Sequence, residues 1–537
     1  MQKGIEMLVK HLKDDNLIMV VVDEDCDGQT SSAVLLNYLH TIFPSIVESK
    51  FYYIFHEGKK HGIILDELKP NTGLIIAADS SSEEYELHDF LASQGIDVLV
   101  LDHHPTDIIS SSACVINNKL SQNYSNKGLS GVGIVYKFCQ QLDTLLLRTS
   151  IITEPIADTW IDLVAIGLIA DMSSFLDLET VHLIRKGLKN IHNPYLSLII
   201  QNNSYSIGNR VTPFGISFYV APYINAVTRI GTKEEKKILF EAMLDWKAEN
   251  LIPSTKRGCK GQMETIAEQA VRNCVNIKKR QDKIVNEYLI KIIQSIENND
   301  LTKNKVILIK LEEEINPAIC GLIANKIADK YKQPTLILNK DKNNENNLIR
   351  SARGVNNSEL TNFKELCIKS NLTTLAAGHE SAFGFGILIE NIDKFHEYMN
   401  EQLKNITFTP SYKVDFILNS NEINSKDIVE IAQMKEVWGQ DVPEPYLVIK
   451  NIAITKDNLV LMGLNKNKPT LKITLPNGID VIKFKSSEEE YDNLYSTSGC
   501  VIIDMIVRAE LNEYMGIIKP QLIVAEYQIV KRQEYYF

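Results

Sequence analysis

The sequence lacks several features that mark specialised classes of protein. Its eight cysteines include no C-x-x-C pair, which argues against a disulfide framework and against a cysteine-ligated zinc site. No uncharged apolar run approaches the length that spans a bilayer, and the first twenty residues have no apolar core of a secretory signal. We therefore expect a cytoplasmic protein with reduced cysteines and no membrane association.

A surplus of basic charge is also absent. The chain has 57 basic and 68 acidic residues, and its net charge is −11. Binding of nucleic acid requires a local basic surface rather than a basic average, and a cluster of acidic metal ligands makes the total more negative. The net charge therefore does not decide whether a nucleic acid is the partner.

The composition is that of a soluble globular protein, with 44% hydrophobic and 23% charged residues. A chain of 537 residues is too long for one hydrophobic core, so we expect three or four domains. In the first third, short apolar runs alternate with segments of helical spacing, as in a parallel α/β sheet. The predicted strands are residues 17–22, 74–78 and 96–101, and the predicted helices lie near 30–40, 63–68, 83–93, 132–147, 156–170 and 180–191.

Three further regions follow this first unit. Residues 255–299 have helical spacing and are the most basic part of the chain, which predicts a connecting helix or, equally well, a helix whose charges only keep it soluble. A second α/β unit is predicted from strands 305–309 and 335–338 and helix 317–331. From about residue 406 the pattern is β-rich and compatible with a small barrel, with short alternating runs at 459–464, 470–475, 480–484 and 501–507.

Acidic residues and histidines follow the predicted strands of the first unit. They are Asp23, Asp25 and Asp27 after the first strand, Asp79 after the second, Asp102, His103 and His104 at the end of the third, and Asp171 after the helical run 163–170. Because the carboxyl ends of parallel strands meet at one edge of a sheet, these side chains should converge there. A single aspartate after a strand is more often a turn or helix-capping residue, but three strand ends together favour a shared site.

Convergence of so many carboxylates is unfavourable unless cations offset their repulsion. Carboxylates with one or two imidazoles suit Mn²⁺ or Mg²⁺ better than Zn²⁺. We expect two divalent ions about 4 Å apart, which support in-line hydrolysis of a phosphoester. Manganese is the expected ion and magnesium the alternative. Gly28 is expected to permit a tight turn into a helix that begins near Gln29, with its N-terminus toward a phosphate.

The same residues resemble the four motifs of the DHH phosphoesterases, and in particular of the RecJ-like single-strand-specific exonucleases. The resemblance implies that Asp25, Asp27, Asp79, His103 and Asp171 are metal ligands, with Asp79 bridging both ions. It implies that Asp102 orients the site and that His104 contacts the scissile phosphate or assists the leaving group. RecJ-like proteins often have a histidine two residues before the first of these aspartates, where this chain has Val21; Asp23 is expected to compensate as an oxygen ligand.

Other segments are similar to the family beyond the metal motifs. They are residues 221–226 with Arg229, residues 316–324, residues 351–353, residues 376–380, and residues 438–445 in the β-rich region. The resemblance implies substrate-binding roles for Asn225, Arg229, Arg280, Ser351, Arg353, Gly378 and His379. Taken singly, such an arginine or histidine is more often a surface or hydrogen-bonded residue. Ala376 and Ala377 stand where the family usually has glycines.

The fold class that follows is α/β with a β-rich end. We expect a parallel-sheet DHH domain at residues 1–195, a linker region with a long connecting helix at 196–299, a second α/β DHH-associated domain at 300–405, and a C-terminal OB-like nucleic-acid-binding domain at 406–537. Candidate base-stacking residues in the last are Tyr446, Phe484, Tyr491 and Tyr495, although a core position is the commoner role for any one of them.

The expected function is metal-dependent hydrolysis of single-stranded DNA from the 5′ end, with release of mononucleotides. The family resemblance implies the polarity. A single-strand-binding protein or a helicase is an expected partner. Two alternatives remain at this stage: a phosphodiesterase for oligonucleotides or cyclic dinucleotides, and a catalytically silent nucleic-acid-binding replication subunit on the same scaffold.

Overall fold

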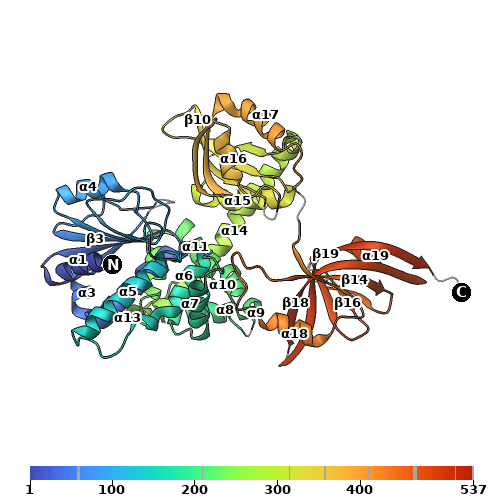
Figure 1. Ribbon diagram of the computed structural model, residues 1–537, viewed down its shortest axis with the longest axis horizontal. Coiled ribbons are helices and arrows are strands. Elements are labelled where there is room, and N and C mark those ends of the chain that lie inside the picture. Colours follow the sequence, from blue (N-terminus) through green and yellow to red (C-terminus); the bar gives the residue numbers. More distant parts are fainter. Residues whose placement is uncertain are drawn as a thin grey trace. The chain divides into compact units, whose positions relative to one another are not determined.

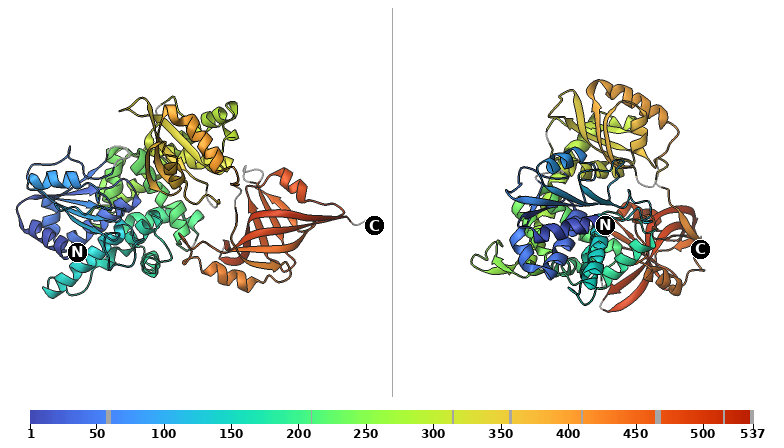
Figure 2. Two further views of the ribbon diagram at one scale, coloured as in Figure 1. Left: turned by 45° about the horizontal axis from the view of Figure 1, so that its top comes forward. Right: turned by 60° about the vertical axis from the view of Figure 1, so that its left-hand side comes forward.

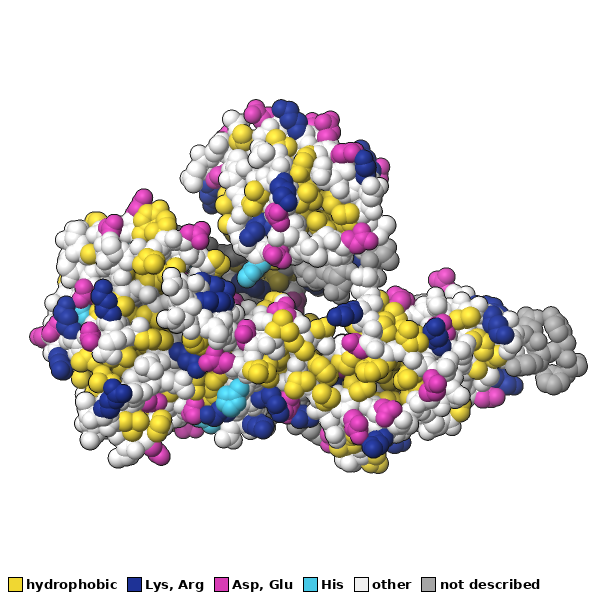
Figure 3. Space-filling model, viewed as in Figure 1, with side chains coloured by type: hydrophobic (Ala, Val, Ile, Leu, Met, Phe, Trp, Pro, Cys, Tyr) yellow, Lys and Arg dark blue, Asp and Glu magenta, His cyan; other side chains and the backbone are white. Residues whose placement is uncertain are grey.

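The computed structural model describes residues 1–56, 61–208, 210–313, 315–355, 358–408, 411–463, 469–514 and 516–534. The chain forms two compact units. The larger one contains residues 1–173, 182–207 and 215–411, and the smaller one contains residues 174–181, 208–214 and 412–537. On the face shown in Figure 3, acidic and basic side chains are interspersed within each unit. Within the described residues, no helix has both the length and the apolarity needed to cross a membrane.

The larger unit begins with a five-stranded sheet in which all neighbouring strands are parallel. Its order is β2 (Phe51–Phe55), β1 (Leu17–Val22), β3 (Thr72–Ala78), β4 (Asp97–Asp102) and β5 (Cys114–Asn117). Helix α4 (Tyr85–Ser93) covers one face, and α1 (Gln2–Lys13) and α5 (Gly131–Arg148) cover the other (Figure 1). The predicted parallel α/β sheet is confirmed, and the missed strands β2 and β5 lie at its two edges.

Helices then dominate. They are α2 (Cys26–Ile42) and α3 (Pro44–Lys50) within the sheet region, then η1 (Ala157–Trp160), α6 (Ile161–Ala170), α7 (Leu178–Lys189), α8 (Pro194–Asn202), α9 (Ser204–Ile207), α10 (Pro213–Tyr219), α11 (Ala221–Ile230), α12 (Lys233–Ala242) and α13 (Asp245–Ala248). The predicted helix near residues 63–68 is wrong, because that segment forms only a turn, closed by the Leu68 amide donating to Leu65. Ile63, Ile64 and Leu68 nevertheless pack on the sheet, which accounts for the apolar pattern.

The predicted connector is the 33-residue helix α14 (Ile266–Asn298). It starts later than expected because Thr265 and Glu268 form a capping box at Ile266. The residues before it contain the short hairpin of β6 (Leu251–Pro253) and β7 (Met263–Thr265). One face of α14 is buried, so this helix is a packed element rather than a solvated spacer.

A second sheet follows in the order β11 (Thr373–His379), β12 (Ala382–Leu388), β10 (Asn347–Arg353), β9 (Thr335–Lys340) and β8 (Ile307–Lys310). Only β8 and β9 are parallel. Side chains alternate along the strands between two cores. Ile307, Ile309 and Ile337 pack against α14 and α15 (Pro317–Tyr331). The other face packs against α16 (Phe363–Lys369) and α17 (Ile392–Gln402) through Phe363 and Phe395.

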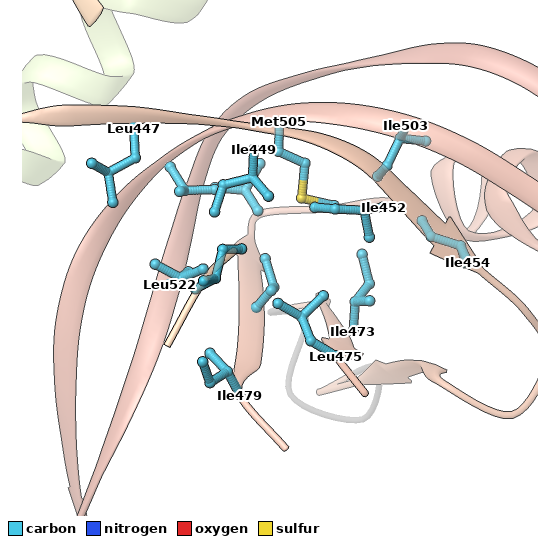
Figure 4. Packing of buried hydrophobic residues seen from close by; sticks show 14 of the residues in the cluster. Leu447, Ile449, Ile452, Ile454, Ile473, Leu475, Ile479, Ile503, Met505 and Leu522 are labelled. Atoms are coloured by element: carbon cyan, nitrogen blue, oxygen red, sulfur yellow. The ribbon is translucent and has the colours of Figure 1, made fainter. Parts of the chain in front are cut away.

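The smaller unit is built on a seven-stranded sheet. Its order is β13 (Val414–Asn419), β14 (Tyr446–Ile454), β18 (Gly499–Tyr514), β19 (Ile517–Glu534), β17 (Asp480–Phe484), β16 (Thr470–Thr474) and β15 (Leu459–Met462), with helices α18 (Ser425–Gln433) and α19 (Glu488–Leu494). Strands β18 and β19 run side by side as a long hairpin (Figure 2). Aliphatic side chains from β14, β16 and β18 point into one core (Figure 4). The β-rich prediction is confirmed; residue 464, at the end of one predicted run, lies outside the described residues.

Candidate metal centre

The loop after β1 places three aspartates at the carboxyl edge of the sheet. Asp25 is the N-cap of α2 and accepts a 3.0 Å hydrogen bond from the Gly28 amide. The helix thus begins at Cys26, and the expectation of a tight turn at Gly28 is wrong. Gly28 lies in the first turn for a different reason: a Cβ atom there would lie 2.5 Å from Cβ of Asp23. A glycine therefore lets the helix approach the strand end closely.

Asp27 is fixed by the N-terminus of α5. Its carboxylate accepts hydrogen bonds from the amides of Gly131 at 2.7 Å and Val132 at 3.2 Å, and from Oγ of Ser130 at 3.0 Å. Burial and the charge of Asp25 nevertheless raise the pKa of Asp27 to about 7. These donors position the carboxylate but do not offset the repulsion from its acidic neighbours.

Asp79 directly follows β3 and is 1% exposed. Its backbone has φ of 71°, a left-handed conformation that a non-glycine residue adopts at a cost. None of the described residues donates a hydrogen bond to either oxygen of its carboxylate. Burial, followed by the charges of Asp27 and Asp25, raises the pKa of Asp79 well above its usual range. A buried carboxylate without donors requires a positive partner, and a divalent cation meets that requirement.

Asp102 ends β4 and orients the two histidines that follow. Its Oδ1 accepts hydrogen bonds from the His103 amide at 2.7 Å and from Nδ1 of His104 at 2.8 Å. Its Oδ2 accepts one from the Ser82 amide at 3.1 Å. Burial would raise the pKa of Asp102, but the hydrogen bond from His104 and its charge outweigh that effect and lower it. Asp102 therefore remains ionised behind the two histidines.

The two histidines differ in protonation. Burial, with the nearby charge of His104, lowers the pKa of His103 to about 4, so its ring is neutral and able to bind a metal. Burial also lowers the pKa of His104, but the hydrogen bond and charge of Asp102 raise it overall to about 9. His104 is therefore a cation at neutral pH, and half of its side chain is exposed.

The expected ligands do come together. Nε2 of His103 lies 3.1 Å from Oδ1 of Asp79 and 3.7 Å from Oδ2 of Asp171, the C-cap of α6. Burial and the charge of Asp27 raise the pKa of Asp171 well above its usual range. Among the described residues, three overlapping sets of ligand atoms are close enough together to surround an ion: Asp23 with Asp25 and Asp79, Asp27 with His103 and Asp171, and Asp79 with Asp102, His103 and His104. The residues present thus fit the binding of divalent cations by mostly oxygen ligands.

Sequence reasoning missed three residues beside this centre. His61 lies 2.7 Å from Asp23 through Nδ1, and Nε2 of His56 lies 4.0 Å from the other oxygen of Asp23. Lys236 of α12 forms a buried ion pair with Glu24 at 2.9 Å. A search for strand-end histidines would have identified His56, the residue after β2, once β2 was recognised.

The second sheet carries four of the predicted substrate-binding residues: Ser351 and Arg353 on β10, and Gly378 and His379 on β11. Arg353 is the last residue of β10. Burial is the main cause that lowers the pKa of Arg353, and the charge of nearby Arg229 lowers it further. Burial also lowers the pKa of His379, and among the neighbouring charges that of His104 contributes most. Gly378 has φ of 128°, and Ser351 is buried at 8% exposure in β10. A positive group for a phosphate therefore lies near the metal centre.

Two of the predicted substrate-binding residues have structural partners. The Asn225 side chain accepts a 3.0 Å hydrogen bond from the Cys26 amide and so holds the start of α2. Arg280 of α14 donates to the Ile230 carbonyl at 3.0 Å and pairs with Glu235 at 3.2 Å. Asn225 thus connects α11 to the start of α2, and Arg280 connects α11 to the long helix α14.

The candidate stacking residues of the β-rich unit differ in how their rings are packed and exposed. Tyr491 and Tyr495 stack on each other with ring centres 5.5 Å apart and pack against the core. The Tyr446 ring meets that of Tyr412 edge-on at 5.1 Å. Phe484 is 58% exposed, so it is the most accessible of the four.

Comparison with known proteins identifies the family. The chain is 33% identical to YorK from the SPbeta prophage of Bacillus subtilis, a proposed single-strand DNA-specific exonuclease, over 99% of this chain and 91% of that protein. Residues 17–168 match the N-terminal domain of the DHH family, and residues 414–526 match the RecJ OB domain. The chain is a RecJ-like member of the DHH family.

Further relatives agree with this assignment. The single-stranded-DNA-specific exonuclease RecJ of Bacillus subtilis is 24% identical over 98% of this chain and 63% of its own length. The crystal structure of RecJ from Thermus thermophilus in complex with Mn²⁺ has a TM-score of 0.72, at 16% identity, and covers 98% of this chain and 71% of its own. The RecJ-like fold and its OB-like β-rich end are thus confirmed.

Proposed function

We propose that this RecJ-like chain is a metal-dependent exonuclease that hydrolyses the phosphodiesters of single-stranded DNA. The observation that carries the proposal is Asp79, a buried carboxylate to which no residue in the described part of the chain donates a hydrogen bond, and which lies near four other aspartates and His103. The names of the relatives support single-stranded DNA as the substrate. The family resemblance supports 5′→3′ polarity and release of mononucleotides.

The centre binds divalent cations, and we assign two of them. Asp23, Asp25 and Asp79 would hold one, and Asp27, His103 and Asp171 the other, with Asp79 between the two. Bound cations would act as Lewis acids toward the phosphodiester and make the attacking water more acidic. We prefer manganese, with magnesium as the alternative, since the oxygen-rich ligand sets suit both ions and structural neighbours are complexes with Mn²⁺ and with Mg²⁺.

We propose that His104 offers a proton to the substrate. Its Nδ1 donates to Asp102 at 2.8 Å, which leaves Nε2 as the second proton-bearing atom of a cationic ring. We assign to it the contact with the scissile phosphate or the donation of a proton to the leaving oxygen. Asp102 acts through His104 as a positioning residue.

Arg353, Arg229 and His379 bind phosphates of the strand. Two guanidinium groups whose like charges oppose each other gain from an anion between them. Gly321 of α15 leaves room for Arg353, since a Cβ atom there would lie 2.1 Å from Nη2 of that arginine. We also assign substrate-binding roles to Asn225, Arg280, Ser351 and Gly378, as the family resemblance implies.

The remaining assignments follow the same proposal. The catalytic domain comprises residues 1–195, the linker region 196–299, the DHH-associated domain 300–405, and the OB-like domain 406–537. Exposed Phe484 on β17 is the residue we assign to stacking on a base. We place the protein in the cytoplasm, where a single-strand-binding protein or a helicase would present single strands to it.

One digestion experiment tests the substrate assignment. Single-stranded and duplex oligonucleotides labelled at either end, and a labelled dinucleotide, are incubated with the protein in Mn²⁺. The proposal predicts mononucleotides from the long single strand, starting at its 5′ end, with duplex resistant. Preferential turnover of the dinucleotide would instead assign the chain to small substrates, and absence of any metal-dependent release would reject the nuclease assignment.

A further inference from the structure

Strand β2, at the edge of the first sheet, also ends beside the metal centre. It pairs in parallel with β1, and its last residue, Phe55, aligns with Val22. The next residue on each strand is therefore His56 on one and Asp23 on the other. This edge strand delivers imidazoles to the same edge of the sheet at which β1, β3 and β4 deliver carboxylates.

His61, in the segment after β2, makes the closest of these contacts. Its Nδ1 lies 2.7 Å from Oδ2 of Asp23, whose side chain is only 1% exposed. Half of the His61 side chain is exposed, in contrast to the buried carboxylate that it contacts. The ring is also near enough to Asp25 and His104 for their charges to act on it.

One carboxylate oxygen of Asp23 is available to bind a cation. Its Oδ2 pairs with His61, but its Oδ1 is buried and accepts no hydrogen bond from the residues that the structure describes. Asp23 is also one of the three carboxylates whose oxygens are close enough to surround a cation. The His61 nitrogen lies 2.7 Å from one oxygen of Asp23, which is the spacing of neighbouring ligand atoms around one ion with metal–ligand bonds of about 2.0–2.2 Å. His61 is not itself part of the set of mutually close ligand atoms, so its ring would turn toward Asp25 and Asp79 when a cation binds.

Position 21 cannot supply a nitrogen ligand here. Val21 is completely buried and packs with Ile54 and Ile75 in the apolar core beneath the sheet edge. Any imidazole for the cation at Asp23 must therefore come from another element, and β2 is the strand next to β1 on that side.

We infer that His61 is a nitrogen ligand of the cation held by Asp23, Asp25 and Asp79. This inference rests on the proposed function only in that a divalent cation binds at this centre. Binding of a cation would release to solvent the proton that Nδ1 now donates to Asp23. The imidazole, left neutral with its proton on Nε2, and the carboxylate would then both be available as ligands. Nε2 of buried His56 lies 4.0 Å from the other oxygen of Asp23.

Metal binding and spectroscopy test the inference without reference to turnover. Mn²⁺ is titrated calorimetrically into the full chain, and coupling of Mn²⁺ to ¹⁴N is measured by pulsed electron paramagnetic resonance. The variants are His61→Ala, His103→Ala and the double variant. His192→Ala is the matched control, because His192 is also half-exposed and also pairs through Nδ1 with a buried aspartate, Asp162, at 3.1 Å.

The expected result is a loss of Mn²⁺ affinity at one site of about ten- to a hundredfold in His61→Ala and no change in His192→Ala. Nitrogen coupling should persist in His103→Ala and disappear in the double variant. Unchanged Mn²⁺ affinity in His61→Ala would overturn the inference. It would also be overturned if His61→Ala bound Mn²⁺ more weakly but His103→Ala showed no nitrogen coupling, because His61 would then only orient Asp23. Failure of the nuclease assignment would appear separately, as absent strand degradation by a wild-type protein that still binds Mn²⁺.

Discussion

Nδ1 of His104 donates a 2.8 Å hydrogen bond to Oδ1 of Asp102, a carboxylate that is completely buried at the end of β4. The same oxygen accepts from the His103 amide, so one carboxylate sets the orientation of two consecutive histidines. The pair combines a neutral ring, suited to a metal, with a cationic ring, suited to a phosphate. The two roles thus fall on consecutive residues, His103 and His104.

We predict that Asp102→Asn lowers kcat for single-stranded DNA by about a hundred- to ten-thousandfold, as expected for loss of a correctly oriented acid. Mn²⁺ affinity should change much less than kcat, because the metal-binding carboxylates are retained. Steady-state digestion and calorimetric titration measure the two effects. A variant with normal kcat would contradict the positioning role of Asp102.

Gly131→Ala tests the close packing around Asp79. A Cβ atom at residue 131 would lie 2.4 Å from Oδ1 of Asp79, so the carboxylate or the start of α5 must shift. We expect weaker Mn²⁺ binding and reduced nuclease activity in a folded protein. Gly384→Ala is the matched control, since its Cβ would make only ordinary contacts of 3.5 Å or more. Equal Mn²⁺ affinities for the two variants would contradict the prediction.

The buried ion pair of Glu24 and Lys236 tests how the motif loop is held. Both side chains are 6% exposed, and Nζ of Lys236 also donates to the His56 carbonyl at 2.9 Å. Lys236→Met leaves a buried charge and should lower the free energy of unfolding by about 3–5 kcal/mol. The double variant Glu24→Met/Lys236→Met should recover most of that loss. Urea denaturation measures both, and an equal loss in the two variants would exclude the ion pair as the cause.

His192 provides a prediction on pH. Its hydrogen bond to Asp162 raises the pKa of His192 in the folded protein above the ordinary value of about 6.5. A raised folded-state pKa contributes stability that is complete below the unfolded pKa and is lost as pH rises through the folded pKa. Because the ring is 41% exposed, solvent screening keeps this contribution below about 1 kcal/mol.

The measurement is the unfolding free energy of wild type and His192→Ala at pH 5.5 and pH 8.5. The wild type should exceed the variant by more at pH 5.5 than at pH 8.5. A difference that does not depend on pH would show that the Asp162 hydrogen bond does not stabilise the protonated ring.

The sequence predicted that these acidic side chains converge, because their placement depends on the ends of strands. Parallel strands must deliver Asp25, Asp79 and Asp102 to one edge, and hydrophobic spacing is enough to locate those strands. His61 was not predicted, because it is a single histidine in an irregular segment after an unrecognised edge strand. Likewise, the antiparallel partners of β10 depend on pairing between distant segments, which no local pattern reveals.

Helix boundaries show the same limit. The capping box of Thr265 and Glu268 could have been recognised from the sequence and would have placed the start of α14 at Ile266. The turn at residues 65–68 could not have been recognised from the sequence, because the apolar residues around it pack on the sheet at a spacing that a helix would also give.

Release of nucleotides by Asp79→Asn and Asp171→Asn tests the central claim most directly. Each variant, with Asp329→Asn at an exposed position of α15 as the control, is incubated with a 5′-labelled single strand in Mn²⁺. We predict that the two centre variants lose degradation of the strand together with Mn²⁺ binding, while the control keeps both. Degradation that persists in both centre variants would contradict the assignment of hydrolysis to this metal centre.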